Sequence, residues 1–174
     1  MNGNDLVWYA CYGSNLCAER FRYYIEGGLC PLNNRPYKGC SDKTLWRASR
    51  VQRFKGKRYF AQSSGTWGGK GVAFYNPDAD GCVTMRLYLI TREQFKEVQE
   101  QEGKSDSWYG RIIDLGTDDA GIPIYTFTSK RRGEPNAPSE NYASLIRTAL
   151  IEECGLSQAE AEAEMSIIAN SKEK

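Results

Sequence analysis

The alternation of apolar and polar positions divides the chain into interleaved strands and helices. An apolar run from Leu6 to Cys11 predicts a buried strand, and the pattern from Cys17 to Ile25 predicts a helix. The stretch between them reads Tyr12-Gly13-Ser14-Asn15-Leu16, and its glycine, serine and asparagine are turn and cap formers. We expect a sharp turn here, with unpaired backbone N–H groups available to an anion.

The remaining pattern continues this mixture of strands and helices. Residues 26–42 form a long irregular connection. Residues 44–54 are expected to pair with 58–63 as a hairpin, and 109–115 with 122–128. Further strands are predicted at 72–75 and 82–90, and further helices at 91–101, 139–154 and 158–170. Thr91 with Gln94 predicts a capping box at the second helix. We predict an α+β fold, a small mixed, largely antiparallel β-barrel with flanking α-helices, forming a single domain over residues 1–174.

Composition narrows the chemistry that this chain can perform. None of its 174 residues is a histidine. This excludes Ser-His-Asp and Cys-His catalysis, histidine-ligated zinc and histidine general bases. A carboxylate, Tyr, Lys or Cys must therefore move the proton if the chain is an enzyme. The six cysteines are scattered without a C-x-x-C pair, and we interpret them as reduced thiols.

Charge and hydropathy add expectations about location and partners. The formal net charge of +1 gives no overall attraction to nucleic acid or anionic membrane. No apolar run approaches the ~20 residues that span a bilayer, and no signal peptide is evident, so we expect a cytoplasmic protein without membrane attachment. Residues 43–58 hold seven basic and no acidic residues, interleaved with aromatics. Such a hairpin could bind single-stranded nucleic acid, although a solvated face explains it equally simply.

Glu102 is the candidate acid–base group. The second predicted helix ends in Gln101-Glu102-Gly103, and the glycine leaves the Glu102 carboxylate at a loop edge. A glutamate near a helix end is usually solvated surface. Glu102 becomes a candidate catalytic residue only in combination with the turn at 12–16.

The chain resembles the gamma-glutamyl cyclotransferase superfamily, which includes the AIG2-like proteins. The resemblance rests on Tyr12-Gly13-Ser14-Asn15-Leu16 after the first strand, on Gln101-Glu102-Gly103, and on Tyr109 opening the next strand. Residues 138–142 before a helix that ends at 154–156 are a weaker match. Enzymes of that superfamily convert a gamma-glutamyl amine or peptide to 5-oxoproline and free amine, without a metal or organic cofactor.

The resemblance implies roles for individual residues. Glu102 would be the general acid/base, and the substrate would be a small gamma-glutamyl molecule rather than nucleic acid or membrane. The substrate-binding residues would be Tyr12, Gly13, Ser14, Asn15, Leu16, Tyr109 and Tyr142. The oligomeric state is left open.

Alternative interpretations stand beside these roles. Tyr142 lies in a helical pattern with apolar residues, which favours a core position, and Tyr109 is open between packing and hydrogen bonding. The glycine-rich stretch 65–71 lacks a P-loop pattern and is interpreted as a mobile loop and candidate cover for the pocket. A non-catalytic member that binds a small ligand or partner, and a nucleic-acid-binding module using residues 43–58, remain the alternatives.

Overall fold

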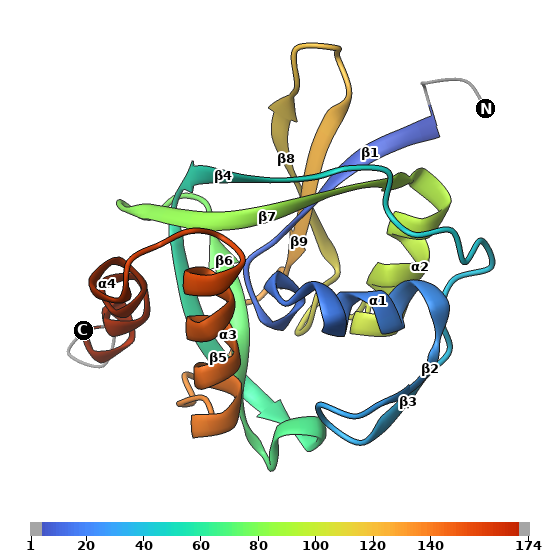
Figure 1. The fold of residues 1–174 in the computed structure, drawn as a ribbon. Coiled ribbons are helices and arrows are strands. Elements are labelled where there is room, and N and C mark those ends of the chain that lie inside the picture. Colours follow the sequence, from blue (N-terminus) through green and yellow to red (C-terminus); the bar gives the residue numbers. More distant parts are fainter. Residues whose placement is uncertain (1–4, 171–174) are drawn as a thin grey trace.

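The computed structural model describes residues 5–170, and a five-stranded sheet forms its centre (Figure 1). The strand order in this sheet is β4-β7-β1-β9-β8. Its members are β1 (Leu6–Cys11), β4 (Ser49–Lys55), β7 (Cys82–Thr91), β8 (Arg111–Thr117) and β9 (Pro123–Thr128). β1 is parallel to β9, and the other neighbouring pairs are antiparallel. The predicted mixed, largely antiparallel α+β fold is therefore confirmed.

Two small sheets complete the β-structure. They are formed by β2 (Gly28–Cys30) with β3 (Arg35–Tyr37), and by β5 (Lys57–Ser64) with β6 (Lys70–Asn76). Because the strands of residues 5–170 belong to three separate sheets, they do not close into one continuous hydrogen-bonded barrel. The short β2–β3 pair lies within the segment expected to be irregular.

The predicted hairpin between residues 44–54 and 58–63 is wrong. β4 pairs with β7, whereas β5 pairs with β6. Gly56 is the corner between the two sheets: its φ is +131°, and a Cβ there would lie 2.5 Å from the Asn76 carbonyl oxygen. The chain therefore leaves one sheet and enters the other instead of turning back on itself. The predicted hairpin of β8 and β9 is confirmed.

The α-helices and 3₁₀ turns named below surround the sheets. They are η2 (Ser14–Leu16), α1 (Ala18–Glu26), η3 (Gly65–Trp67), α2 (Arg92–Glu102), α3 (Glu140–Glu152) and α4 (Gln158–Asn170). Helix α2 packs on β1, β7 and α1, whereas α4 packs on β5 and α3. The capping box of Thr91 and Gln94 is confirmed, and it fixes the start of α2. None of the described helices is long and apolar enough to span a membrane.

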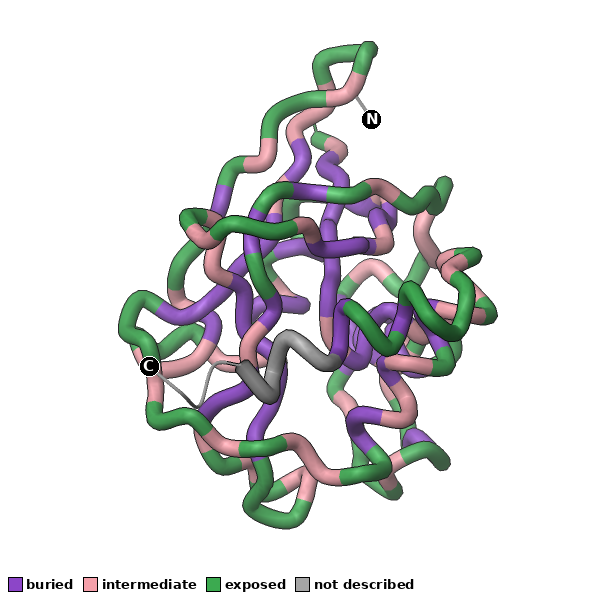
Figure 2. Tube along the Cα trace, turned by 90° about the vertical axis from the view of Figure 1, so that its left-hand side faces the viewer, coloured by how far each residue is buried: buried purple, intermediate pink, exposed green. Residues whose placement is uncertain are grey.

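The core lies where the five-stranded sheet and the β5–β6 sheet meet the helices. Figure 2 shows buried residues concentrated along the central strands and exposed residues on the outer loops. β1 is buried along almost its whole length, which explains why its sequence is continuously apolar instead of alternating. Since β1 is the middle strand, the turn that follows it emerges at the centre of the molecule.

Candidate functional site

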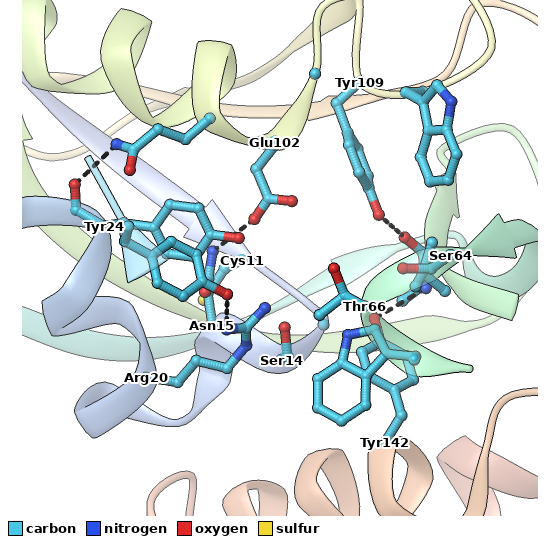
Figure 3. A pocket seen from close by; sticks show the side chains of 18 of the residues that line it. Cys11, Ser14, Asn15, Arg20, Tyr24, Ser64, Thr66, Glu102, Tyr109 and Tyr142 are labelled. Carbon is cyan, nitrogen blue, oxygen red and sulfur yellow. Dashed lines mark hydrogen bonds between the residues drawn. The ribbon is translucent and has the colours of Figure 1, made fainter. Parts of the chain in front are cut away.

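A cavity of about 540 Å³ opens where the end of β1, the end of α2 and the 63–67 segment meet (Figure 3). This volume is in the range of small-molecule binding sites. Its charged lining residues are Arg20, Arg35, Lys38 and Glu102. The turn residues Gly13, Ser14 and Asn15 line the same cavity, so the turn and Glu102 meet at one place.

The Glu102 carboxylate is held by the turn. The Asn15 side-chain Nδ2 donates to Glu102 Oε1 at 3.0 Å and also to the Tyr9 hydroxyl at 3.2 Å. Glu102 reaches the cavity because α2 ends there, with Gly103 at φ +108°. Burial raises the pKa of Glu102, and this outweighs the charge of Arg20 and hydrogen bonds from Tyr24 and Asn15, which lower it.

Asn15 and Arg20 each keep an unused polar atom. Within residues 5–170, Asn15 Oδ1 and Arg20 Nε are buried without a hydrogen-bond partner. The backbone N–H groups of Ser14 and Asn15 begin the 3₁₀ turn, so no carbonyl of that turn accepts from them. Because unpaired buried polar groups are costly, such a concentration at one cavity indicates groups that a ligand would satisfy.

Tyr109 and Tyr142 flank the cavity on either side of Ala73 in β6. The Tyr109 hydroxyl donates to the Ala73 carbonyl at 2.8 Å, and the Tyr142 hydroxyl accepts from the Ala73 N–H at 3.0 Å. A Cβ on Gly13 would lie 3.2 Å from the Tyr142 hydroxyl. Both rings are buried and both line the cavity, so each combines the packing and pocket roles left open by the sequence.

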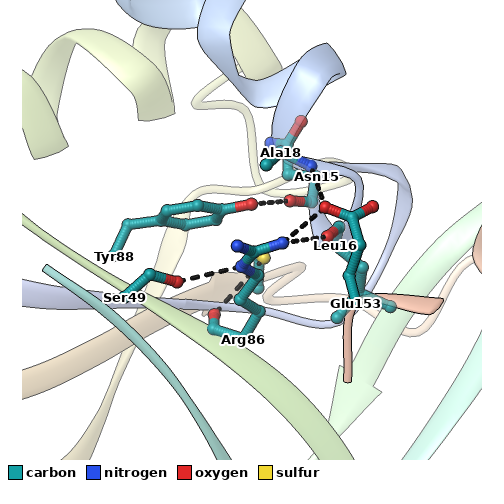
Figure 4. A network of polar contacts seen from close by, with 8 residues as sticks. Asn15, Leu16, Ala18, Ser49, Arg86, Tyr88 and Glu153 are labelled. Atoms are coloured by element: carbon teal, nitrogen blue, oxygen red, sulfur yellow. Dashed lines mark hydrogen bonds and ion pairs between the residues drawn. The ribbon is translucent and has the colours of Figure 1, made fainter. Parts of the chain in front are cut away.

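The turn itself is fixed from behind by charged and polar side chains. Arg58 Nε donates to the Tyr12 carbonyl at 2.7 Å, and the Tyr88 hydroxyl donates to the Asn15 carbonyl at 2.7 Å. Arg86 Nη1 donates to the Leu16 carbonyl at 3.4 Å (Figure 4). These three hydrogen bonds fix the carbonyl groups of Tyr12, Asn15 and Leu16.

A carboxylate completes this support. Glu153, at the end of α3, accepts from both Arg86 Nη1 and the Ala18 backbone N–H (Figure 4). The pair therefore links β7, α3 and the first residue of α1. We call Arg58, Arg86, Tyr88 and Glu153 the rear support of the turn.

Two members of the predicted set have different environments from the others. Leu16 does not line the cavity; it is fully buried in the core, because the 3₁₀ turn directs its side chain inward. Tyr12 does line the cavity, but its hydroxyl donates a hydrogen bond to the Phe127 carbonyl at 2.8 Å. Gly13 has φ −111°, so the space beside Tyr142, not a left-handed backbone, favours glycine there.

Sequence reasoning missed several cavity residues. Arg20 and Tyr24 are four positions apart on the buried face of α1. The signal in the sequence was a charged residue, Arg20, on the otherwise apolar face of this predicted helix. The cavity is also lined by Ser63, Ser64, Gly65, Thr66 and Trp67. The first part of the glycine-rich stretch 65–71, predicted as a candidate cover, therefore forms part of the cavity wall. Arg58, by contrast, is buried beneath the turn, so the basic stretch 43–58 is not a single solvated face. No group of three or more potential metal ligands occurs among the described residues.

The α+β architecture, with a mostly antiparallel sheet and flanking helices, is shared by solved structures. A structure described as a gamma-glutamyl cyclotransferase superposes with a TM-score of 0.68 at 20% identity, covering 93% of this chain and 88% of that one. A human protein described as uncharacterized gives 0.66 at 22% identity, covering 93% and 88%. YkqA of Bacillus subtilis gives 0.61 at 18% identity, covering 94% and 54%. The chain has the gamma-glutamyl cyclotransferase fold.

Sequence comparison adds one curated relative. Histone deacetylase 5 of Arabidopsis thaliana is 33% identical over 197 aligned residues, which cover 90% of this chain and 30% of that protein. The chain thus spans about 30% of the length of the curated relative it matches. No family model matches the chain.

Proposed function

We propose that the chain is a gamma-glutamyl cyclotransferase-like enzyme, which converts a gamma-glutamyl amine or peptide to 5-oxoproline and free amine. The contact between Glu102 Oε1 and Asn15 Nδ2 inside the cavity carries this proposal. It joins the two sequence motifs at one place, with a carboxylate whose pKa is raised. The fold shared with a gamma-glutamyl cyclotransferase supports the assignment.

The proposed reaction is an intramolecular aminolysis. The α-amine of the substrate attacks its own γ-carbonyl carbon, and the C–N bond to the released amine breaks. The α-ammonium nitrogen starts with three protons and keeps one as the lactam nitrogen. It therefore loses two protons, and the leaving nitrogen gains two to become the released ammonium. Glu102 accepts a proton from the attacking nitrogen and donates one to the leaving nitrogen.

The cavity provides the positioning that such a ring closure needs. Holding the two reacting atoms in near-attack geometry is worth roughly 7–11 kcal/mol. The N–H groups of Ser14 and Asn15, at the start of the 3₁₀ turn, are donors for the oxygen that becomes negative in the transition state. The unpaired Asn15 Oδ1 is an acceptor suited to the substrate's ammonium group.

A raised pKa makes Glu102 a better match for this task. An α-ammonium has a pKa of about 7.7–8.0, so an ordinary carboxylate is a weak base toward it. Burial of Glu102 narrows the difference between the two pKa values.

The test is a panel of gamma-glutamyl amines and peptides with detection of 5-oxoproline. Glu102→Gln should lower kcat by about 100-fold or more, because general acid–base catalysis contributes roughly 10²–10⁴-fold. Glu100→Gln is the matched control, since Glu100 lies on the exposed side of α2 and pairs with Lys104. Equal turnover by Glu102→Gln and the wild type would remove Glu102 from the mechanism. Ligand binding without product across the panel would favour a non-catalytic member of the same fold.

A further inference from the structure

Arg20 is a buried cation that no carboxylate pairs with among the described residues. Its side chain lies on the buried face of α1, and the residue is only 4% exposed. Arg20 Nη1 donates to the Tyr37 hydroxyl at 2.6 Å, and Nε has no partner. None of the ion pairs within residues 5–170 includes Arg20.

Aromatic rings surround the guanidinium instead. Its central carbon lies 5.6 Å from the ring centres of Tyr24 and Tyr37 and 5.7 Å from that of Trp67. Cation–π contacts offset part of the cost of burying the charge, but they use none of its five N–H donors. A planar carboxylate is the group that best satisfies the remaining N–H groups, because it accepts two parallel hydrogen bonds.

The location of Arg20 decides where that carboxylate would come from. Arg20 lines the same cavity as Asn15 and Glu102 (Figure 3). The cavity also includes Arg35 and Lys38, while Glu102 is its one acidic lining residue among those described. The lining therefore carries an excess of positive charge even when Glu102 is ionised, and this favours an anionic ligand.

We propose that Arg20 binds a carboxylate group of the substrate and thereby sets the position of the reacting amine beside Glu102. This inference rests on the proposed function. A gamma-glutamyl amino acid has two such groups: the α-carboxylate of its glutamyl part and the carboxylate of the amino acid that leaves. Arg20 is in either case a specificity-determining residue.

Carboxylate binding would also act on the base. The positive charge of Arg20 lowers the pKa of Glu102 in the ligand-free protein. A bound carboxylate neutralises that charge, so Arg20 lowers the pKa of Glu102 less once the substrate is in place. Substrates that carry the carboxylate would therefore gain in kcat as well as in affinity.

The experiment measures binding without turnover. Calorimetry on Glu102→Gln would compare gamma-glutamyl-alanine with two analogues, one with the glutamyl α-carboxylate and one with the alanine carboxylate converted to a carboxamide. The series would be repeated with Arg20→Gln added, and with Arg22→Gln as a matched control. Arg22 is two residues away on the exposed face of the same helix, where it pairs with Glu26.

One analogue should bind about 10-fold to 100-fold more weakly than the parent when Arg20 is present, the size expected for a charge-assisted hydrogen bond. That analogue identifies which carboxylate contacts Arg20. The loss should shrink below about 3-fold with Arg20→Gln and persist with Arg22→Gln. The ligand comparison needs no change at Arg20, so it tests the proposal even if that variant does not fold.

The proposal is overturned if both analogues bind as tightly as the parent, if the loss is the same with Arg20→Gln, or if no gamma-glutamyl ligand binds. Its failure is distinct from failure of the proposed function, which is judged by 5-oxoproline release from the wild type. Product release together with carboxylate-independent binding would overturn the role proposed for Arg20 and leave the enzymatic proposal in place. Binding that depends on Arg20 without product release would remove the enzymatic proposal and keep the carboxylate site.

Discussion

At the scale of single residues, Glu102 carries a pKa that burial raises above its ordinary value. The folded protein therefore holds the Glu102 proton to a higher pH than the unfolded chain does. The resulting stability contribution is fully present below the pKa of the unfolded chain and is lost as pH rises through the folded pKa.

Glu102→Gln should consequently be more stable than the wild type at pH 7–8, because the amide removes a buried charge and still accepts from Asn15 Nδ2. The advantage should shrink as the pH is lowered toward 4. Denaturant unfolding of both proteins across this pH range measures it. A difference in free energy of unfolding that grows on acidification would contradict the direction of the shift.

Gly13 permits a second prediction, which concerns space in the cavity. Gly13→Ala places a methyl group 3.2 Å from the Tyr142 hydroxyl and 3.4 Å from Ala73 Cβ. We expect kcat/KM to fall about 10-fold, equivalent to ~1.4 kcal/mol, because the new methyl group displaces Tyr142 and narrows the site. Steady-state kinetics with the best panel substrate measures this. Unchanged kinetics would show that this wall of the cavity does not contact the substrate.

At the scale of elements, the turn at 12–16 depends on contacts from strands and a helix far away in sequence. β5 and β7 hold its carbonyl groups through Arg58, Arg86 and Tyr88. Glu153 adds the end of α3 to this rear support (Figure 4). A short turn without a regular hydrogen-bonding ladder of its own acquires rigidity in this way.

Glu153→Gln tests this support. The amide can still accept from the Ala18 N–H, but it cannot neutralise Arg86. We expect a loss of about 1 kcal/mol in the free energy of unfolding, and a several-fold fall in kcat with little change in KM. Glu152→Gln is the control, since Glu152, the last residue of α3, is exposed. Identical kinetics for the two variants would mean that the rear support stabilises the fold without positioning the turn.

At the scale of the whole molecule, α4 is anchored by a carboxylate that reaches two sheets. Glu164 accepts from the Thr84 N–H of β7 at 2.8 Å and pairs with Arg58 of β5 at 3.5 Å. The Arg58 and Glu164 side chains are 1% and 8% exposed. The same Arg58 supports the Tyr12 carbonyl, so the helix, both sheets and the turn share one charged pair.

Glu164→Ala should lower the free energy of unfolding by about 3–5 kcal/mol, because it leaves Arg58 buried and unpaired. The lower figure corresponds to a fall in Tm of about 6–12 °C for a chain of this size. Glu162→Ala, on the exposed side of α4, is the matched control and should shift Tm little. Thermal denaturation measures both, and equal shifts would show that the buried pair contributes no more than a surface contact.

The sequence predicted most of the elements, but not β2 and β3, and it predicted the two motifs of the site. Continuous apolar residues marked β1, the capping box marked the start of α2, and the turn at 12–16 followed from its own residue types. These signals are local, because strand burial, helix capping and turn formation depend on residues within a few positions. The single-domain organisation stays a prediction.

The tertiary structure decided which segments meet. Nothing local distinguishes a hairpin of residues 44–54 with 58–63 from the observed corner at Gly56, because the outcome depends on the long-range pairing of β4 with β7 and of β5 with β6. Likewise, Arg20 resembled any helix arginine until packing enclosed it among aromatic rings, and Leu16 resembled its neighbours until the turn directed it into the core. Sequence therefore determined the groups available for chemistry, whereas long-range packing determined which of them share the cavity, how far each is buried, and hence the direction in which their pKa values shift.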